Sequence, residues 1–259
     1  MKDIQGKISV IMPAFNEAGR IAANVEETIA TFNNFGCAYE LIVIDDGSTD
    51  NTFLALEELS KKYPRQLIVR KNPYNLGKGR AIKKALHYLD GDYVVFLDAD
   101  MDLHPAQVQT LFDIMRLDKA DIVIGSKRHP LSRVNYPFLR IIYSRVYQVL
   151  VKILFGLNVT DTQVGIKLFK RKVLNKVMPR LVIKAWAFDL EVLVVASHLG
   201  FSRIIEAPVK LQMRHFGSKI GFSAIRNILI DTIAIFYRLN FLRYYDRKIS
   251  QEAKKLHPG

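Results

Sequence analysis

The sequence has little of several features on which particular classes of protein depend. It contains a single cysteine, Cys37, among 259 residues, so it cannot form an internal disulfide and is not a disulfide-stabilised scaffold. Its 14 glycines and 9 prolines are too few for a collagen-like fibre, and its 49% hydrophobic content is too high for a disordered chain. The composition therefore indicates a globular protein of one large or two small domains. The single cysteine indicates a compartment that is reducing or indifferent to thiols.

Long apolar runs are also missing. The run Ile8–Met12 follows a polar N-terminus and is too short for the core of a signal peptide. The two best candidates for a membrane span are residues 146–157, which a lysine interrupts, and residues 222–236, which contain an arginine and an aspartate. Because a span requires roughly 20 apolar residues without such charges, we expect neither a targeting segment nor a transmembrane helix.

Two familiar ligand motifs are absent as well. None of the six histidines pairs with another at the spacing of zinc ligands. The glycine-containing segment 75–80 has neither the spacing of a dinucleotide-binding fingerprint nor the Gly-Lys-Ser/Thr ending of a P-loop. Its backbone amides, together with Lys78 and Arg80, are still suited to phosphates. The start of a helix is an equally good interpretation of this segment.

Acidic residues are scarce in only one part of the chain. Overall, 38 Lys and Arg oppose 25 Asp and Glu, which gives a net charge of +13. Residues 1–125 contain 14 basic and 18 acidic residues, whereas residues 126–259 contain 24 and 7, so the two parts carry −4 and +17. A segment this basic needs an anionic partner, which is nucleic acid, a membrane surface or a phosphorylated small molecule.

The first half alternates short β-branched apolar runs with amphipathic helical patterns. This alternation predicts an α/β fold with a mostly parallel sheet covered by helices on both faces. Strands are expected at Ile8–Met12, Glu40–Asp45, Gln66–Arg70, Asp92–Asp98 and Asp121–Gly125, with helices at Ala18–Phe35, Asn51–Lys62, Lys78–Leu89 and Pro105–Arg116. In the less regular second half, strands are expected at Val164–Phe169 and Phe201–Met213, with helices at Tyr136–Phe155, Phe188–Leu199 and Gly221–Tyr245. Ligands bind at the carboxyl ends of such strands, so the polar residues there are candidates for a site.

Adjacent carboxylates follow the second predicted strand. Asp45 and Asp46 repel each other, so they need hydrogen-bond donors, a cation or a polar ligand such as ribose or a base edge. The alternative is a turn or helix cap, because Asp, Gly, Ser and Thr in the segment 45–50 favour both. The same alternative applies to Asn16 and Glu17 after the first strand.

Alternating carboxylates follow the fourth predicted strand. Asp98, Asp100 and Asp102 lie on one side if the chain stays extended. Three carboxylates at that spacing form a hard-oxygen site for Mg²⁺ or Mn²⁺, which also bind pyrophosphate oxygens. An acidic, solvated turn before Pro105 is the alternative.

Taken in order, these motifs resemble those of family 2 glycosyltransferases with a GT-A fold. The matching segments of the first half are Pro-Ala-Phe-Asn-Glu at 13–17, Asp-Asp-Gly-Ser-Thr-Asp at 45–50, Asn-Leu-Gly-Lys-Gly at 75–79, Asp-Ala-Asp at 98–100 and Gly-Ser-Lys-Arg at 125–128. Segments 161–169, 186–191 and 214–219 are similar to the branch that transfers glucose or mannose to dolichyl or polyprenyl phosphate. The resemblance implies a Rossmann-like GT-A catalytic domain over residues 1–220, with an amphipathic insertion at about 133–157. An amphipathic helix and a basic tail would follow over residues 221–259.

The resemblance also implies roles for individual residues. Nucleotide-sugar binding is assigned to Pro13, Ala14, Asn16, Glu17, Asp45, Asp46, Lys78, Asp98, Ala99, Arg214 and Lys219. Metal binding is assigned to Asp98, Asp100 and Asp102, although the mannosyltransferase branch usually has Gln at the position of Asp102. Catalysis is assigned to Asp100, Arg128, Asp161, Gln163 and Asp189, acceptor-phosphate binding to Arg128, Ser218 and Lys219, and the sugar side also to Trp186.

The implied reaction is a metal-dependent, inverting transfer of a hexose from UDP-glucose or GDP-mannose. A divalent cation and basic side chains would stabilise the charge that develops on the departing nucleoside diphosphate. A lipid phosphate is already anionic and needs no strong base, so Asp189 would orient rather than deprotonate it. If the acceptor is a saccharide or protein hydroxyl instead, Asp189 or Glu191 is the candidate base. The motifs at 161–163 and 186–189 favour the glucosyl branch and UDP-glucose.

The basic second half fits a membrane-bound acceptor. In 133–157 and 222–245, Arg and Lys lie beside rows of aliphatic and aromatic residues, which is typical of helices in a membrane interface. Ordinary helices that pack on the sheet with solvated charges are the alternative. We expect peripheral association with the cytoplasmic face of an anionic membrane, either directly or through a partner that supplies a membrane span. A nucleic-acid-binding module is disfavoured because no RNA-binding signature is present.

Overall fold

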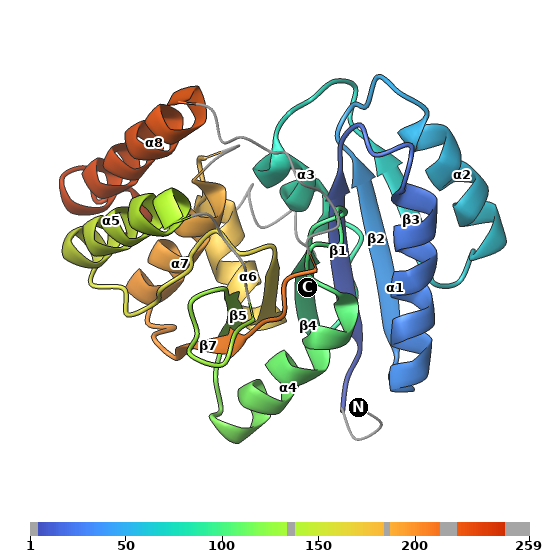
Figure 1. Cartoon of the computed structure of the whole chain (residues 1–259), viewed down its shortest axis with the longest axis horizontal. Coiled ribbons are helices and arrows are strands. Elements are labelled where there is room, and N and C mark those ends of the chain that lie inside the picture. The colour runs from blue at the N-terminus through green and yellow to red at the C-terminus, as the bar shows by residue number, and fades with distance from the viewer. Residues whose placement is uncertain (1–4, 134–137, 184–186, 213–221, 247–259) are drawn as a thin grey trace.

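The computed structural model describes residues 5–133, 138–183, 187–212 and 222–246 (Figure 1). These residues form one seven-stranded sheet with the order β3-β2-β1-β4-β6-β5-β7. The strands are β1 (Ile8–Ala14), β2 (Tyr39–Asp45), β3 (Leu67–Lys71), β4 (Tyr93–Leu97), β5 (Ile122–Ser126), β6 (Ile166–Lys170) and β7 (Ile204–Pro208). Only β6 runs against its neighbours, antiparallel to β4 and β5. The predicted mostly parallel α/β sheet is therefore confirmed.

The first four strands are the apolar runs that the sequence pattern identified. Val10, Ile11 and Met12 of β1 and residues 41–44 of β2 have no exposed surface, which requires cover on both faces of the sheet. The covering helices are α1 (Ile21–Phe35), α2 (Thr52–Lys62), α3 (Lys78–Ala85) and α4 (Val108–Leu117), with a 3-10 turn at Pro105–Gln107. Because β1 to β4 are parallel, and Ala14 pairs with Asp45 at the ends of β1 and β2, the polar segments that follow these strands meet at one edge.

The described residues of the second half include four α-helices. They are α5 (Phe138–Phe155), α6 (Arg171–Val177), α7 (Phe188–His198) and α8 (Phe222–Asn240), with 3-10 turns at Met178–Arg180 and Tyr244–Asp246. Helix α7 is buried along residues 188–196. Helices α5 and α8 lie side by side at the opposite end of the molecule from α1 and α2 (Figure 1), joined by a 3.0 Å hydrogen bond between Tyr147 Oη and Thr232 Oγ1. In the described part of the chain, no helix is long and apolar enough to cross a membrane.

Two elements differ from the expectations. The strand predicted at Phe201–Met213 is confined to β7, because Pro208 has no N–H to continue the ladder. Beyond it, only the isolated bridges Leu103–Leu211 and Arg133–Lys210 occur among the described residues. Helix α6 was not predicted, since its seven residues give too short a pattern to recognise.

Candidate active site

A cavity of about 290 Å³ opens at the carboxyl ends of β1, β2 and β4. Its walls come from the segments that follow these strands and from the start of α3. The lining includes Pro13, Ala14, Glu17, Asp46, Lys78, Asp98, Ala99 and Asp100, all predicted from the sequence, together with Phe15, Asn75 and Gly77. Apolar walls, carboxylates and a lysine thus converge on one space, as is typical of small-molecule sites.

The predicted three-aspartate arrangement is not preformed. Met101 adopts a left-handed conformation with φ 58°, so the chain from Asp98 to Asp102 is not extended and the expected alternation breaks. The backbone N–H of Asp102 instead donates to Asp100 Oδ1 at 3.0 Å, and Asp102 does not line the cavity. Across the described residues, no group of three His, Cys, Asp or Glu side chains is placed to hold a metal ion. Of the three aspartates, Asp98 and Asp100 face the cavity, which Glu17 and Asp46 also line.

Asp100 is partly buried beside other carboxylates, and a bound cation would offset their repulsion. Burial raises the pKa of its carboxyl to about 6, and the nearby charges of Asp98, Asp102 and Glu17 act in the same direction. Carboxylate oxygens are the ligands that Mg²⁺ and Mn²⁺ prefer. The residues present therefore fit a divalent cation held by Asp98 and Asp100.

Asp45 presents an unsatisfied oxygen at the end of β2. Its side chain is fully buried, and Oδ1 accepts a 3.3 Å hydrogen bond from the backbone N–H of Ser48. Oδ2 has no hydrogen-bond partner, and the Lys71 ammonium lies 3.9 Å from it. A buried acceptor without a hydrogen bond is costly, so this oxygen is suited to a donor group, although Asp45 itself does not line the cavity.

Asp46, by contrast, is fully engaged within the protein. Its carboxylate accepts hydrogen bonds from Asn72 Nδ2 at 2.7 Å and from the backbone N–H groups of Leu76 at 3.1 Å and Gly77 at 2.8 Å. Asp46 therefore shapes the turn that leads into α3 and places Lys78 at the cavity. It lines the cavity, but its hydrogen-bonding capacity is used by this turn.

Asn16 does not line the cavity, although the sequence assigned it to the nucleotide. Its exposed side chain accepts a 2.9 Å hydrogen bond from the backbone N–H of Thr49, and its own N–H donates to Ser48 Oγ at 2.9 Å. Asn16 therefore ties the segment after β1 to the segment after β2. The neighbouring Ala14, Phe15 and Glu17 face the cavity.

A chain of alternating charges leads from the cavity into the core. Lys78 Nζ lies 2.8 Å from Asp98 Oδ1 and 3.3 Å from Asp189 Oδ2, and Lys167 Nζ lies 2.7 Å from Asp189 Oδ1. Burial opposes ionisation of Asp189, but the charges of Lys167 and Lys78 outweigh it and hold the pKa of this carboxyl below its ordinary value. Asp189 is therefore a firmly ionised anchor and a poor proton acceptor.

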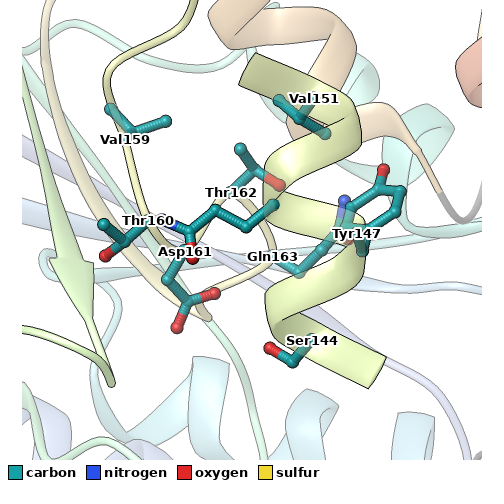
Figure 2. Close-up of a pocket in the computed structure, with 9 residues that line it drawn as sticks. Ser144, Tyr147, Val151, Val159, Thr160, Asp161, Thr162 and Gln163 are labelled. Atoms are coloured by element: carbon teal, nitrogen blue, oxygen red, sulfur yellow. The ribbon is translucent and has the colours of Figure 1, made fainter. Parts of the chain in front are cut away.

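A second, smaller cavity of about 60 Å³ lies between α5 and the segment 159–163 (Figure 2). Asp161 and Gln163 line it, and the buried Gln163 Nε2 has no hydrogen-bond partner. Asp161 Oδ2 accepts a 3.2 Å hydrogen bond from the backbone N–H of Lys127, while Arg128 donates to Gln148 on α5. The predicted residues Arg128, Asp161 and Gln163 are therefore brought together here, apart from the larger cavity.

Two supporting residues were not predicted from the sequence. Glu206 on β7 accepts hydrogen bonds from the backbone N–H groups of Thr160 at 2.6 Å and Asp161 at 3.0 Å, which fixes the segment at the second cavity. Lys167 on β6 fixes Asp189. Glu206 is the one charge in β7, and Lys167 stands between Ile166 and Leu168 in β6. A charge between apolar strand residues is the signal that a buried partner exists.

Glu191 serves the structure of the second half. Its fully buried carboxylate accepts hydrogen bonds from the N–H groups of Val182 at 2.9 Å and Ile183 at 2.8 Å, and from Tyr245 Oη at 2.7 Å. These bonds leave no role for it as the alternative base. Four further predicted residues, Trp186, Arg214, Ser218 and Lys219, lie outside the described residues.

Sequence comparison connects these residues to known proteins. Residues 9–178 match the family model described as Glycosyl transferase family 2. The chain is 32% identical over 256 residues to dolichyl-phosphate beta-glucosyltransferase ALG5D of Trichomonas vaginalis, a match that covers 93% of this chain and 77% of that protein. It is 34% identical over 244 residues to dolichyl-phosphate beta-glucosyltransferase of Dictyostelium discoideum, covering 89% of this chain and 74% of that protein.

The fold is shared with solved glycosyltransferase structures. Mannosyl-3-phosphoglycerate synthase from Rubrobacter xylanophilus superposes with a TM-score of 0.69 at 17% identity, covering 90% of this chain and 74% of that chain. Glucosyl-3-phosphoglycerate synthase from Mycobacterium tuberculosis, in complex with Mn²⁺, UDP-glucose and phosphoglyceric acid, superposes with a TM-score of 0.64 at 20% identity, covering 89% and 79%. At these identities the likeness establishes the GT-A fold.

Proposed function

The chain belongs to glycosyl transferase family 2 and is a glycosyltransferase, and from this premise we propose that it transfers glucose from UDP-glucose to dolichyl or polyprenyl phosphate at a membrane surface. The observation that carries the proposal is the identity of 32% and 34% to two dolichyl-phosphate beta-glucosyltransferases, of which the chain covers 77% and 74%. GDP-mannose is the alternative donor.

The larger cavity would hold the donor. Asp45 does not itself line this cavity but precedes Asp46, which does, and its Oδ2, which has no hydrogen-bond partner, would accept a hydrogen bond from the base or ribose. Asp98 and Asp100 would hold Mg²⁺ or Mn²⁺. The Mycobacterium tuberculosis enzyme, which has the same fold, was solved with Mn²⁺ and UDP-glucose, and this supports a cation and a nucleotide sugar as ligands. Such a cation supplies electrostatic stabilisation to a departing diphosphate, and Lys78 would add a second positive charge from the cavity wall.

Inversion follows from the proposed donor and product. Glucose is α-linked in UDP-glucose, and attack from the opposite face gives a β-linked product. The relatives named above are beta-glucosyltransferases, which supports this stereochemistry.

The state of Asp189 favours a phosphate over a hydroxyl acceptor. A hydroxyl needs a base to accept its proton, whereas a lipid phosphate is already ionised at neutral pH. Asp189 is paired with Lys78 and Lys167, its pKa is held low, and its side chain is 6% exposed, so it lacks the basicity and the access that a base requires. Arg128 would contribute to the acceptor phosphate, together with Ser218 and Lys219.

The adjacent helices α5 and α8 offer a surface for the membrane that carries such an acceptor. Exposed apolar side chains follow one another at helical spacing on each helix, and exposed basic residues flank them. The apolar residues are Val146, Val149 and Ile153 on α5, and Leu229, Ile230, Ile233 and Tyr237 on α8, followed by Phe241 and Leu242. The exposed basic residues are Arg145, Lys152, Arg226 and Arg243. These apolar and basic residues together are called the α5–α8 surface.

We propose that the α5–α8 surface contacts the cytoplasmic leaflet of the membrane. Each basic residue near an anionic leaflet contributes about 1 kcal/mol to such binding.

A direct transfer assay tests the proposal. Purified protein, UDP-glucose, Mn²⁺ or Mg²⁺ and dolichyl phosphate in anionic liposomes are expected to yield β-glucosyl lipid, and Asp100→Ala is expected to lose this activity. GDP-mannose replaces the donor in one control, and a saccharide replaces the lipid in another. Absence of transfer from every common nucleotide sugar, or full activity of Asp100→Ala, would refute the proposed function.

A further inference from the structure

The ammonium group of Lys78 lies between two carboxylates at the wall of the larger cavity. Its Nζ atom is 2.8 Å from Asp98 Oδ1 and 3.3 Å from Asp189 Oδ2. The Asp98 side chain is 36% exposed and faces the cavity, whereas that of Asp189 is 6% exposed. Lys78 therefore contacts both Asp98, which is accessible from the cavity, and Asp189, which is buried in the interior.

Asp189 is fixed from behind by a lysine that does not line the cavity. Lys167 Nζ is 2.7 Å from Asp189 Oδ1 and also donates to the backbone carbonyl of Val164. The Lys167 side chain is 1% exposed and lies in the middle of the sheet, on the strand between β4 and β5. Because an unpaired buried charge is strongly disfavoured, this pair holds Asp189 ionised and in place whatever Lys78 contacts.

Lys78 and a divalent cation compete for Asp98. Both are positively charged, and the ammonium already occupies Oδ1, one of the two oxygens that a cation would use. The ammonium can leave Asp98 and keep a counter-ion, because Asp189 Oδ2 is only 3.3 Å away and a lysine stem is flexible. A nucleoside diphosphate would bring negative charge that favours the cation and the ammonium together.

We propose that Lys78 is an exchangeable counter-ion of Asp98, an inference that rests on the proposed metal-dependent function. In the nucleotide-free protein its ammonium neutralises Asp98 and opposes cation binding. When a cation and a donor diphosphate bind together, the ammonium moves onto Asp189 and the diphosphate. Lys167 is the positioning residue that keeps Asp189 available as the second anchor, and cation binding is thereby coupled to donor binding.

Mn²⁺ binding measured by electron paramagnetic resonance, with and without UDP, tests this exchange. Lys78→Met is expected to bind Mn²⁺ about five- to tenfold more tightly than the unaltered protein without UDP, because the competing charge is gone. With Mn²⁺ present, the same variant is expected to bind UDP at least about fivefold more weakly, since the diphosphate loses a cationic partner. The matched control is Lys61→Met, which removes an exposed positive charge on α2 and is expected to change neither affinity.

A second variant guards against a folding defect in Lys78→Met. Lys78→Gln keeps a hydrogen-bond donor without the charge, and it is expected to shift the affinities for Mn²⁺ and UDP in the same directions as Lys78→Met. The exchange is overturned if the unaltered protein binds Mn²⁺ with UDP but neither variant binds Mn²⁺ more tightly without it. If the unaltered protein binds no Mn²⁺ even with UDP, the proposed metal-dependent function fails, and this inference fails with it.

Discussion

Gly165 lies so close to Asp98 that a Cβ atom at residue 165 would be 2.4 Å from Asp98 Oδ2. The backbone N–H of Asp98 also donates to the carbonyl oxygen of Gly165 at 3.2 Å. The end of β4 and the start of β6 therefore meet directly beside a candidate metal ligand. Glycine is needed here for space, which makes residue 165 a sensitive probe of the site.

Gly165→Ala is expected to fold normally and to lose activity. The added methyl group meets the rotatable carboxylate of Asp98, so this carboxylate moves while the backbone need not. A misplacement of this size lowers the transfer rate by about 100-fold, while the melting temperature changes by only a few degrees. The control is Gly19→Ala, whose Cβ would meet no atom within 4 Å. Steady-state kinetics and thermal denaturation measure both quantities, and normal kinetics of Gly165→Ala would contradict the role of Asp98.

Glu206→Ala is expected to slow transfer without weakening donor binding. It removes the acceptor of the Thr160 and Asp161 N–H groups, so the segment at the second cavity loses its fixed position. We expect kcat to fall about tenfold or more, while the affinity for UDP stays within about twofold because neither residue lines the larger cavity. Glu206→Gln keeps one acceptor oxygen and should recover part of the rate. A parallel loss of UDP affinity, measured by calorimetry, would show that the two cavities are not separate.

Glu191→Gln is expected to change how stability depends on pH. Burial raises the pKa of the Glu191 carboxyl above its ordinary value, although Tyr245 and the N–H groups of Val182 and Ile183 favour the ionised form. A carboxyl whose pKa is raised by folding contributes most to stability at pH values below its unfolded pKa. That contribution is lost as the pH rises through the window up to the folded pKa.

The measurement is the free energy of unfolding in urea at pH 4.5 and pH 7. The advantage of the unaltered protein over Glu191→Gln should be larger at pH 4.5, since glutamine does not titrate. Glu57→Gln, an exposed substitution on α2, serves as the control. An advantage that grows between pH 4.5 and pH 7 would contradict the raised pKa of Glu191.

Charged substitutions on the α5–α8 surface are expected to abolish membrane binding selectively. Ile153 on α5 and Ile233 on α8 are 75% and 62% exposed, so glutamate at both positions costs no core packing but repels an anionic leaflet. We expect the double variant to float with anionic liposomes at least about tenfold less than the unaltered protein. Leu54→Glu is the matched control, because Leu54 is 55% exposed on α2 at the other end of the molecule. Equal flotation of all three proteins would exclude this surface as the membrane contact.

The sequence by itself determined the α/β class, most strands and most of the residues that line the larger cavity. These depend on local information: apolar runs such as 41–44 specify buried strands, and parallel strands bring the segments after them to one edge. Local reasoning failed where the chain left a regular conformation, as at Met101, whose left-handed φ separates Asp102 from the cavity.

Only the tertiary structure decided which charges meet. The antiparallel strand β6 lies between β4 and β5, and its Lys167 contacts Asp189. Asp189 in turn contacts Lys78, which also contacts Asp98. These ion pairs cannot be predicted from a local sequence pattern, because Lys78, Lys167 and Asp189 lie on different elements. Their approach depends on how the whole sheet is assembled. The same assembly brings the Glu206 carboxylate to the backbone N–H of Asp161 and leaves Asp189 ionised between two lysines. The motifs thus specified which polar side chains gather at the larger cavity, and the packing of distant segments specified which charges these side chains meet.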